Sequence, residues 1–294
     1  MKHYPFTDHY QEMNGLRLHY LDEGSGEPVV MLHGNPTWSF YYRNLVLGLR
    51  GRYRCIVPDH MGCGLSDKPG DDRYTYTLES RVNDLERLLE RLGIKEGITL
   101  VLHDWGGMIG TAFAVRHPGR IKRLVILNTA AFHLPKEKRL PFTLRLCRDT
   151  AVGAFLVRAL NAFSLAASFV GCKRNPMPAE TRRLYRLPYD SWRNRIATLR
   201  FVQDIPLVPG DRSFRLVSET EGGLNLLASR PMAIFWGELD FVFDRTFLAE
   251  WERRFPKAEV HRYADCGHYI LEDAQDEIIP LIARFLEPTK QAED

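Results

Sequence analysis

The first half of the chain alternates short apolar runs with segments of helical periodicity, and this alternation limits the fold more than any other feature. Apolar runs this short and continuous are typical of strands buried on both faces of a sheet. Their alternation with helices predicts an α/β fold with a mostly parallel central sheet and helices on both faces. The predicted strands are residues 16–21, 28–32, 54–58, 98–102 and 124–127, and the predicted helices are 78–92 and 106–116.

The alternation stops after Asn128. Residues 132–222 are rich in Leu, Phe, Ala and Arg, with helical spacing in 144–169 and 180–201. Strand-like runs resume at 232–236 and 260–263, and a closing helix is predicted over 278–285. We therefore predict a core made of residues 1–131 and 223–294, interrupted by an inserted helical cap, or lid, of residues 132–222.

Composition and charge exclude several classes of protein. The 294 residues include 40 Lys or Arg and 37 Asp or Glu, and this net charge of +3 is too small to indicate nucleic-acid binding. No apolar run reaches the ~18 residues of a transmembrane helix, and the first 14 residues lack the apolar stretch of a secretory signal. The five cysteines are odd in number and form no CxxC pair, which favours a reducing, cytoplasmic location over a disulfide framework or zinc site.

The segment LVLHDWGGMIG (100–110) places an acidic residue between an apolar run and a helical pattern. This strand–turn–helix context is that of a nucleophile elbow, where serine hydrolases carry a serine and this chain carries Asp104. Gly106 and Gly107 allow the turn to pack closely. Because an aspartate before a helix can also serve only as its N-cap, this segment alone leaves both interpretations open.

Two later strand ends carry an acid and a histidine. Asp240 follows the run 232–236, and His268 follows the run 260–263. Each could be an ordinary turn or surface residue, but the order nucleophile, acid, histidine is that of the α/β-hydrolase fold. Glu238 and Asp244 are weaker candidates for the acid.

Two loops of the first half complete the pattern. HGNPTW (33–38) follows the run 28–32, where an α/β-hydrolase supplies a backbone N–H of its oxyanion hole. A tight Gly/Pro turn is the alternative interpretation. DHMGCGLSDKP (59–69) is expected to be structural, with glycines that permit a sharp turn under the site.

Together, HGNPTW, DHMGCGLSDKP, HDWGG, GELD and DCGH resemble the haloalkane dehalogenase superfamily of α/β-hydrolases, over nearly the whole chain outside the cap. The resemblance implies that Asp104 is the nucleophile, His268 the base and Asp240 its partner. It also implies that Asn35 and Trp105 hold the leaving group. One subgroup carries its acid after the preceding strand, but residues 127–129 of this chain contain no carboxylate, which favours Asp240.

Within this superfamily, HGNPTWSFYYR, DHMGCGLSDKP and RYTYTLESRVNDL (73–85) look most similar to the β-lactone decarboxylases of bacterial long-chain olefin biosynthesis. That resemblance implies decarboxylation of a cis-3,4-dialkyl β-lactone to a cis-alkene and CO2. The alternative within the superfamily is a haloalkane dehalogenase that hydrolyses alkyl halides to alcohol and halide. The alternative from another class is a non-catalytic ligand receptor on the same fold.

An aspartate nucleophile itself carries chemical information. Serine that attacks a saturated carbon leaves an ether, whereas a carboxylate leaves an ester that water can cleave. Asp104 therefore favours an alkyl halide, an epoxide or a strained lactone over an esterase or protease substrate. In the hydrolytic mechanism His268 deprotonates water, Asp240 fixes the histidine tautomer, and the backbone N–H groups of Asn35 and Trp105 hold the oxyanion. Epoxide hydrolases of this fold usually carry an aromatic residue at position 35, so Asn35 counts against that substrate.

The cap has two notable segments. The apolar side chains of residues 142–169 either pack on the core or line an access tunnel for alkyl chains. Residues 173–200 hold eight Lys or Arg against two Asp or Glu, as a solvated helix face or as a docking face for an anionic surface or an acidic protein. We expect no metal or organic cofactor, an apolar substrate with alkyl chains, and partner enzymes of an olefin pathway.

Overall fold

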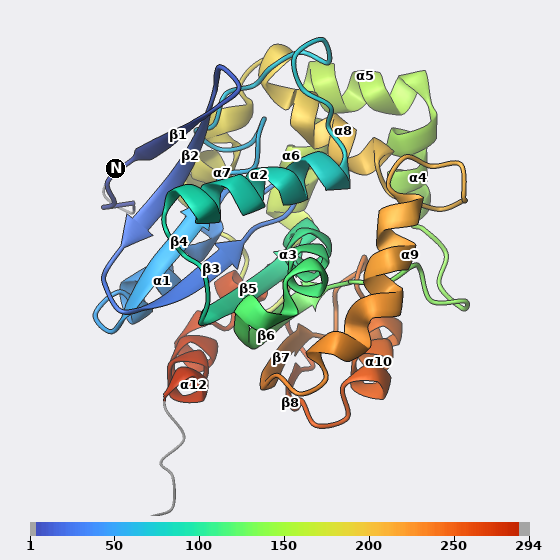
Figure 1. Ribbon diagram of the computed structural model, residues 1–294. Helices are drawn as coiled ribbons and strands as arrows, with labels where there is room; N and C mark the ends of the chain where they lie inside the picture. Colours follow the sequence, from blue (N-terminus) through green and yellow to red (C-terminus); the bar gives the residue numbers. More distant parts are fainter. Residues whose placement is uncertain (1–3, 288–294) are drawn as a thin grey trace, which may run out of the picture.

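The computed structural model describes residues 4–287 and contains one eight-stranded sheet of order β1-β2-β4-β3-β5-β6-β7-β8 (Figure 1). The pairs β1–β2 and β2–β4 are antiparallel, and every other neighbouring pair is parallel. The predicted mostly parallel α/β sheet is therefore confirmed. The strands are β1 (His9–Met13), β2 (Leu16–Glu23), β3 (Glu27–Leu32), β4 (Tyr53–Pro58), β5 (Ile98–Asp104), β6 (Ile121–Thr129), β7 (Met232–Gly237) and β8 (Glu259–Tyr263).

Twelve α-helices lie between and after these strands in the described residues. Those of the sheet layers are α1 (Arg43–Leu49), α2 (Leu78–Arg91), α3 (Trp105–Arg116), α9 (Phe214–Gly223), α10 (Arg245–Arg254), α11 (Ile270–Asp273) and α12 (Gln275–Leu286). The remaining five are α4 (Phe142–Asp149), α5 (Ala151–Leu160), α6 (Ala162–Val170), α7 (Ala179–Arg186) and α8 (Ile196–Gln203).

Each face of the sheet is covered by its own apolar cluster, because successive strand residues point to opposite faces. On β3, Val29 and Met31 join a cluster with side chains of α1 and α12. Their neighbours Val30 and Leu32 join a second cluster with side chains of α2, α3, α9 and α10. This double burial explains why the central strands read as continuous apolar runs.

Local sequence signals set both ends of α2, the helix that the sequence predicted most accurately. The Thr77 side chain accepts a hydrogen bond from the backbone N–H of Ser80 and so caps the start of α2. Gly93, just after the end of α2, has φ +68°, a backbone conformation that residues with side chains rarely adopt. A glycine at this position terminates the helix. The helix predicted over 78–92 is observed as Leu78–Arg91.

Several elements were not predicted. β1 buries only one of its five residues, so it lacks an apolar run, and its pairing with β2 at the sheet edge defines it. The helices α1, α9 and α10 were also missed. The cap segment predicted as one helical stretch over 144–169 is divided, because the chain turns at Thr150 and again at Asn161, which has φ +52°.

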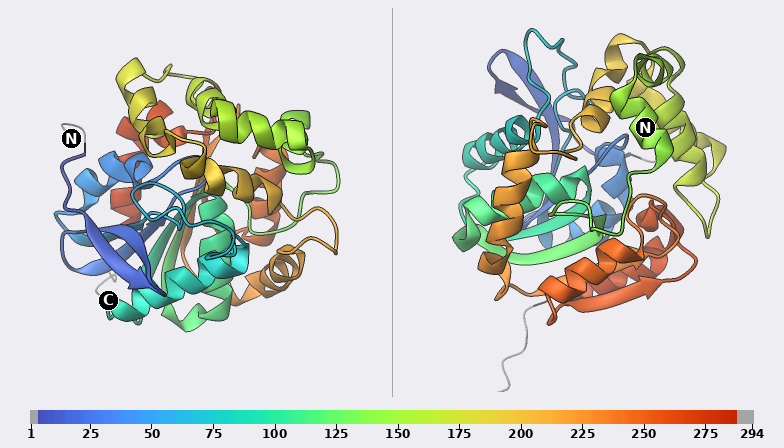
Figure 2. Two further views of the ribbon diagram at one scale, coloured as in Figure 1. Left: turned by 90° about the horizontal axis from the view of Figure 1, so that it is seen from above. Right: turned by 90° about the vertical axis from the view of Figure 1, so that its right-hand side faces the viewer.

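The helices α4–α8 gather at one end of the sheet, as the two views of Figure 2 show. They cover the carboxyl ends of the parallel strands, where α4 and α6 meet residues that follow β5, β7 and β8 around one cavity. The helix α9 lies within the predicted cap but packs against α3. The division of the chain at residues 131 and 223 stays a prediction.

Candidate active site

Asp104 is the last residue of β5 and lies on a sharp turn into α3. Its backbone has φ +51° and ψ −128°, an unusual conformation for a residue with a side chain. Its side chain makes no N-cap hydrogen bond to α3. The turn instead directs the carboxylate toward the cavity that it lines. The structure therefore favours the nucleophile elbow over the N-cap interpretation.

The loop after β3 lies directly against this carboxylate. The backbone N–H of Asn35 donates to Asp104 Oδ1 over 2.6 Å. Gly34 and Gly106 permit the approach, because a Cβ at Gly34 would overlap the Asp104 side chain and a Cβ at Gly106 would overlap the carbonyl of Leu32. The closeness of β3, β5 and α3 thus depends on the absence of side chains at these two positions.

The other two predicted residues lie in line with Asp104. His268 Nδ1 lies 2.7 Å from Asp240 Oδ2, and His268 Nε2 lies 3.6 Å from Asp104 Oδ2. All three side chains are largely buried. The latter distance is longer than a direct hydrogen bond, but it brings the ring within strong electrostatic reach of the carboxylate.

Burial and charge set the protonation of this triad. Burial raises the pKa of Asp104 above its usual value, against the opposing effects of His268 and of the backbone N–H groups of Asn35 and Trp105. Burial lowers the pKa of His268, but the carboxylates of Asp240 and Asp104 outweigh it and raise this pKa above its usual value. The imidazolium form of His268 is therefore stabilised between the two carboxylates.

The weaker acidic candidates lie elsewhere. Glu238 pairs with Arg245 over 2.8 Å. Asp244 caps α10 by accepting from the N–H of Thr246 and pairs with Lys138. Asp240 is thus the acid that contacts His268.

A cavity of about 600 Å³ opens above Asp104. Its lining is mostly apolar and comes from both the sheet layers and the cap. Asn35, Trp105 and His268 contribute to its floor, together with side chains of α4 and α6. A cavity of this size and character suits an apolar organic ligand.

Asn35 and Trp105 both face this cavity, but the Asn35 side chain also contacts the cap. Its Nδ2 donates to the carbonyl of Thr198 on α8 over 3.0 Å, and its Oδ1 is buried without a partner. One N–H of this amide is thus committed to α8, and only the other is free to meet a ligand.

Comparisons with known proteins decide the family. The family model described as alpha/beta hydrolase fold matches residues 27–275, most of the chain. The chain belongs to the α/β-hydrolase fold family.

Curated relatives of this α/β-hydrolase are enzymes. A protein of Shewanella oneidensis named cis-3-alkyl-4-alkyloxetan-2-one decarboxylase is 60% identical over 97% of this chain and 90% of its own length. A protein of the same name from Xanthomonas campestris pv. campestris is 51% identical over 97% of each chain. Haloalkane dehalogenase 2 of Mycobacterium tuberculosis is 30% identical over 96% of each. The predicted membership of the haloalkane dehalogenase superfamily, and the nearer likeness to β-lactone decarboxylases, are confirmed.

Solved structures show the same fold. The haloalkane dehalogenase DbeA from Bradyrhizobium elkani is 25% identical, with a TM-score of 0.84 over 95% of this chain and 97% of that one. DatA from Agrobacterium tumefaciens C58 is 24% identical, also with a TM-score of 0.84, over 95% and 96% of the two chains. The α/β-hydrolase fold predicted from the sequence is therefore confirmed.

Sequence reasoning missed two residues that hold the triad of this α/β-hydrolase in place. Asn128, at the end of β6, donates to Asp240 Oδ2 over 3.1 Å and to the carbonyl of Gly237 over 2.9 Å. A polar residue at the end of a buried strand was the available signal for Asn128.

The second residue is His103, which stacks on Tyr41 and whose Nε2 lies 2.8 Å from the carbonyl of His268. Burial and the neighbouring His268 hold the pKa of His103 well below its usual range, so that its neutral ring donates to this carbonyl.

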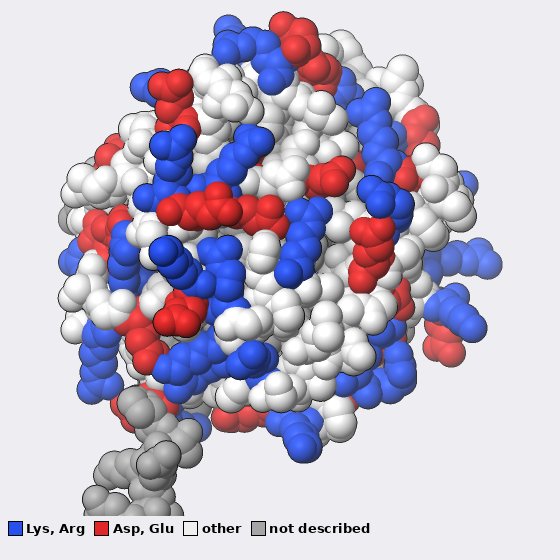
Figure 3. All heavy atoms as spheres, viewed as in Figure 1, with Lys and Arg blue, Asp and Glu red and all other residues white. Residues whose placement is uncertain are grey.

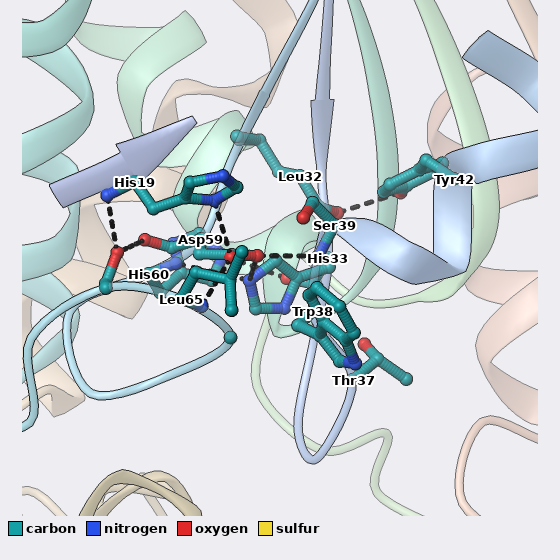
Figure 4. A network of polar contacts seen from close by, with 12 residues as sticks. His19, Leu32, His33, Thr37, Trp38, Ser39, Tyr42, Asp59, His60 and Leu65 are labelled. Atoms are coloured by element: carbon teal, nitrogen blue, oxygen red, sulfur yellow. Dashed lines mark hydrogen bonds and ion pairs between the residues drawn. The ribbon is translucent and has the colours of Figure 1, made fainter. Parts of the chain in front are cut away.

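The stretch 59–69 anchors the loop that carries Asn35, as Figure 4 shows around Asp59. The buried Asp59 accepts from the N–H of Ser39 over 2.6 Å, from the N–H of Leu65 over 2.8 Å and from His19 Nδ1 over 2.8 Å. Burial alone would raise the pKa of Asp59, but His19 and these donors hold it well below its usual range. The network therefore fixes residues 33–39 through buried charge, as expected of a structural segment.

Between residues 4 and 287, no group of three or more His, Cys, Asp or Glu side chains is arranged to hold a metal ion. No single helix in the same range is long and apolar enough to span a bilayer, although α5 and α6, bent by 76° to each other, together have that length and composition.

Proposed function

We propose that this α/β-hydrolase converts cis-3-alkyl-4-alkyloxetan-2-ones, which are β-lactones, to cis-alkenes and CO2. The observation that carries the proposal is the position of the Asp104 carboxylate, on a sharp turn with φ +51° under a mostly apolar cavity. The relatives that bear this activity in their names, at 60% and 51% identity over nearly the whole chain, support it.

In the first step, Asp104 attacks the saturated ring carbon that bears the ring oxygen. The bond between that carbon and the ring oxygen breaks, so that an alkyl ester forms on Asp104 and the lactone carbonyl becomes a free carboxylate. The remaining side-chain N–H of Asn35 and the indole N–H of Trp105 stabilise this new negative charge. Attack on the carbonyl would instead leave the ring oxygen as an alkoxide on the neighbouring carbon. Loss of CO2 with formation of the alkene would then require this oxygen to leave as an oxide, which is a very poor leaving group.

In the second step, the bond to the carboxylate carbon breaks and its electron pair forms the alkene. The bond from the neighbouring carbon to Asp104 breaks at the same time, which releases CO2 and restores the Asp104 carboxylate. No water or proton is consumed. Inversion in the first step followed by anti elimination in the second keeps the two alkyl groups cis.

His268 acts electrostatically in this reaction. The Asp104 carboxylate regains its negative charge as the alkene forms, with the His268 imidazolium beside Oδ2 and the Asn35 N–H at Oδ1. Asp240 stabilises that imidazolium through a 2.7 Å hydrogen bond. The carboxylates of Asp240 and Asp104 raise the pKa of His268, which increases the fraction of the imidazolium that this role uses.

A hydrolytic haloalkane dehalogenase is the second candidate, and the 30% identical mycobacterial relative supports it. There the same alkyl ester forms with loss of halide, and neutral His268 deprotonates a water that attacks the ester carbonyl. The two reactions therefore share the first step and differ in the fate of the ester.

A product assay with a long-chain cis-β-lactone and a bromoalkane, side by side, separates the candidates. We expect cis-alkene from the lactone and slow or no bromide release from short bromoalkanes. Fast bromide release with intact lactone would reverse the order. A single turnover in ¹⁸O-water adds a second readout, because hydrolysis places solvent oxygen in Asp104, whereas decarboxylation leaves it unlabelled.

We further propose a cytoplasmic location and partner enzymes of an olefin pathway. All five cysteines are free thiols and four are buried, as in proteins of a reducing compartment. A strained β-lactone must be made by an upstream ring-closing enzyme before this chain can consume it. The product assay also tests the alternative of a non-catalytic ligand receptor, which would form no product from either substrate.

A further inference from the structure

The outer side of the cap is unusually apolar. Of the fifteen large apolar residues that are exposed in the described part of the chain, nine belong to the segment 142–203, which spans α4–α8. They include Phe155 on α5, 56% exposed, Phe169 on α6, 59% exposed, and Trp192, 51% exposed. We call Val152, Phe155, Leu165, Phe169 and Trp192 the outer cap face. An apolar surface of this kind marks a site that another surface covers.

The two helices that carry most of this face are apolar on nearly every side. Residues 151–170 contain a single charged side chain, Arg158. Leu156, Phe163 and Ala167 turn inward and line the cavity, whereas Phe155 and Phe169 point outward. Because α5 and α6 are bent by 76° and packed against the cavity, they fit a position on a membrane rather than across it.

The same segment is strongly basic. Residues 142–203 hold eleven Lys or Arg and three Asp or Glu, a net charge of +8, so that the rest of the chain carries −5 of the total +3. In the view of Figure 3, which includes α2, α9 and part of the cap, basic and acidic side chains are interspersed. Four carboxylates from outside the segment pair with three of its arginines: Asp211 with Arg148, Asp265 and Glu277 with Arg174, and Asp71 with Arg200. These pairs leave a net charge of +4 on the part of the molecule that exposes apolar side chains.

Arginines border the exposed aromatic rings directly. The guanidinium carbon of Arg158 lies 4.7 Å from the centroid of the Trp192 ring, and that of Arg182 lies 4.4 Å from the centroid of Phe169. Arg158 and Arg182 donate to backbone carbonyls, and within residues 4–287 no carboxylate lies at ion-pair distance from either. Aromatic rings beside arginines suit the boundary between lipid tails and anionic headgroups.

The cavity opens beside this face. Ala166 and Val170 of α6 line the cavity and are also exposed, and so is Phe241 after β7. An apolar path thus connects the outer surface of α6 with Asp104. A substrate with two long alkyl chains dissolves in lipid rather than in water, so the mouth of the cavity lies where such a substrate would be taken up.

We propose that the outer cap face docks on an anionic lipid bilayer and that the cavity takes up its substrate from that bilayer. A second copy of the chain fits less well, because a two-fold contact would bring one net-positive cap against another. The uptake rests on the proposed function, whereas the docking does not.

Cosedimentation of the full chain with vesicles tests the docking. We expect binding to vesicles of equimolar phosphatidylcholine and phosphatidylglycerol, weaker binding in high salt, and none to phosphatidylcholine alone. The double variant Phe155→Asp/Phe169→Asp should bind about tenfold or more weakly. Its matched control is Leu47→Asp/Leu226→Asp, which changes two exposed apolar residues outside the cap and should bind as the original chain does.

A second pair of variants tests the charge. Arg183→Gln/Arg193→Gln should weaken binding, whereas Arg215→Gln/Arg253→Gln, which removes two exposed arginines outside α4–α8, should not. Equal binding by all variants, or no binding by the original chain, would overturn the proposal. So would a dimer that Phe155→Asp/Phe169→Asp dissociates in the absence of vesicle binding, because that result assigns the face to a second copy.

Activity separates this proposal from the proposed function. Turnover of a short, water-soluble β-lactone should be the same in both aspartate variants, which also shows that they fold. Turnover of a long-chain lactone supplied in anionic vesicles should fall about tenfold in Phe155→Asp/Phe169→Asp alone. If no variant decarboxylates any lactone while vesicle binding keeps its residue dependence, the function fails and the docking stands.

Discussion

The sheet and the cap bury apolar side chains to very different degrees. All seven residues of β5 are buried, whereas α5 buries only Gly153 and Val157 among its ten. The sheet therefore fixes Asp104 between packed layers, and small changes there should displace its carboxylate. The cap helices line the cavity with one side and expose apolar groups on the other, so changes there alter which ligands enter. The comparison predicts that substitutions at the end of the sheet lower kcat strongly, whereas substitutions in the cap change kcat/KM for some substrates and not for others.

The largest effect is expected from Asp104→Ala. Loss of the nucleophile should lower kcat by roughly 10⁴-fold or more, because no other group can form the ester. The melting temperature should change little, since the Asp104 side chain does not cap α3. Thermal unfolding and alkene formation measured on one preparation provide the check. Activity like that of the original chain would remove Asp104 from the mechanism.

The pH dependence should distinguish the role of His268 in the two reactions. Its pKa is raised, so the imidazolium persists above the usual range and is lost as the pH rises through the raised value. Lactone decarboxylation, which uses the imidazolium, should then slow, whereas haloalkane hydrolysis, which needs the neutral ring, should accelerate. Both should fail at low pH as Asp104 is protonated, and the raised pKa of Asp104 shifts this loss upward.

The pH profiles of kcat for the two substrates provide the measurement. Mass spectrometry of His268→Ala adds a check, because a bromoalkane that reacts should leave its alkyl group on Asp104 when no base activates water. An unmodified mass at saturating bromoalkane would contradict the shared first step.

A smaller effect is expected at Asn128, which positions Asp240 without facing the cavity. Asn128→Ala removes the hydrogen bonds to Asp240 and Gly237 and should lower kcat roughly tenfold to hundredfold, with little change in KM. Asn83→Ala, which removes a surface asparagine bonded to Arg116, is the control and should leave kcat unchanged. Equal changes in kcat and KM at position 128 would point to a disturbed binding site instead.

The smallest effect should come from the cap and should depend on chain length. Each buried CH2 contributes ~0.8 kcal/mol before ordering costs, so kcat/KM should rise as the alkyl chains lengthen. Phe163→Ala removes an apolar side chain from the lining of the cavity. It should lower kcat/KM a few-fold for substrates with long alkyl chains and hardly at all for those with short ones. Phe155→Ala on the outer cap face is the matched control in detergent solution. An equal loss of kcat/KM for all chain lengths would show that Phe163 only packs within the cap and does not contact the alkyl chains.

Much of the fold could be predicted because the central strands are buried on both faces. The runs that became β3 and β5 contain few polar residues, so sequence periodicity identified them. β1 escaped detection because it pairs at the sheet edge and buries only Met13. The division between α4, α5 and α6 also escaped, since turns at Thr150 and Asn161 leave the apolar spacing nearly continuous.

The sequence by itself determined the types and order of the candidate catalytic residues, because strand–turn–helix signals and the carboxyl ends of parallel strands assign Asp104, Asp240 and His268 to one edge of the sheet. Only the tertiary structure decided what surrounds them. The contact of Asn128 with Asp240 joins residues 112 positions apart, and that of Asn35 with Thr198 joins residues 163 apart. Protonation also depends on the assembled site, because burial and the distances between His268 and two carboxylates arise only when the layers pack together.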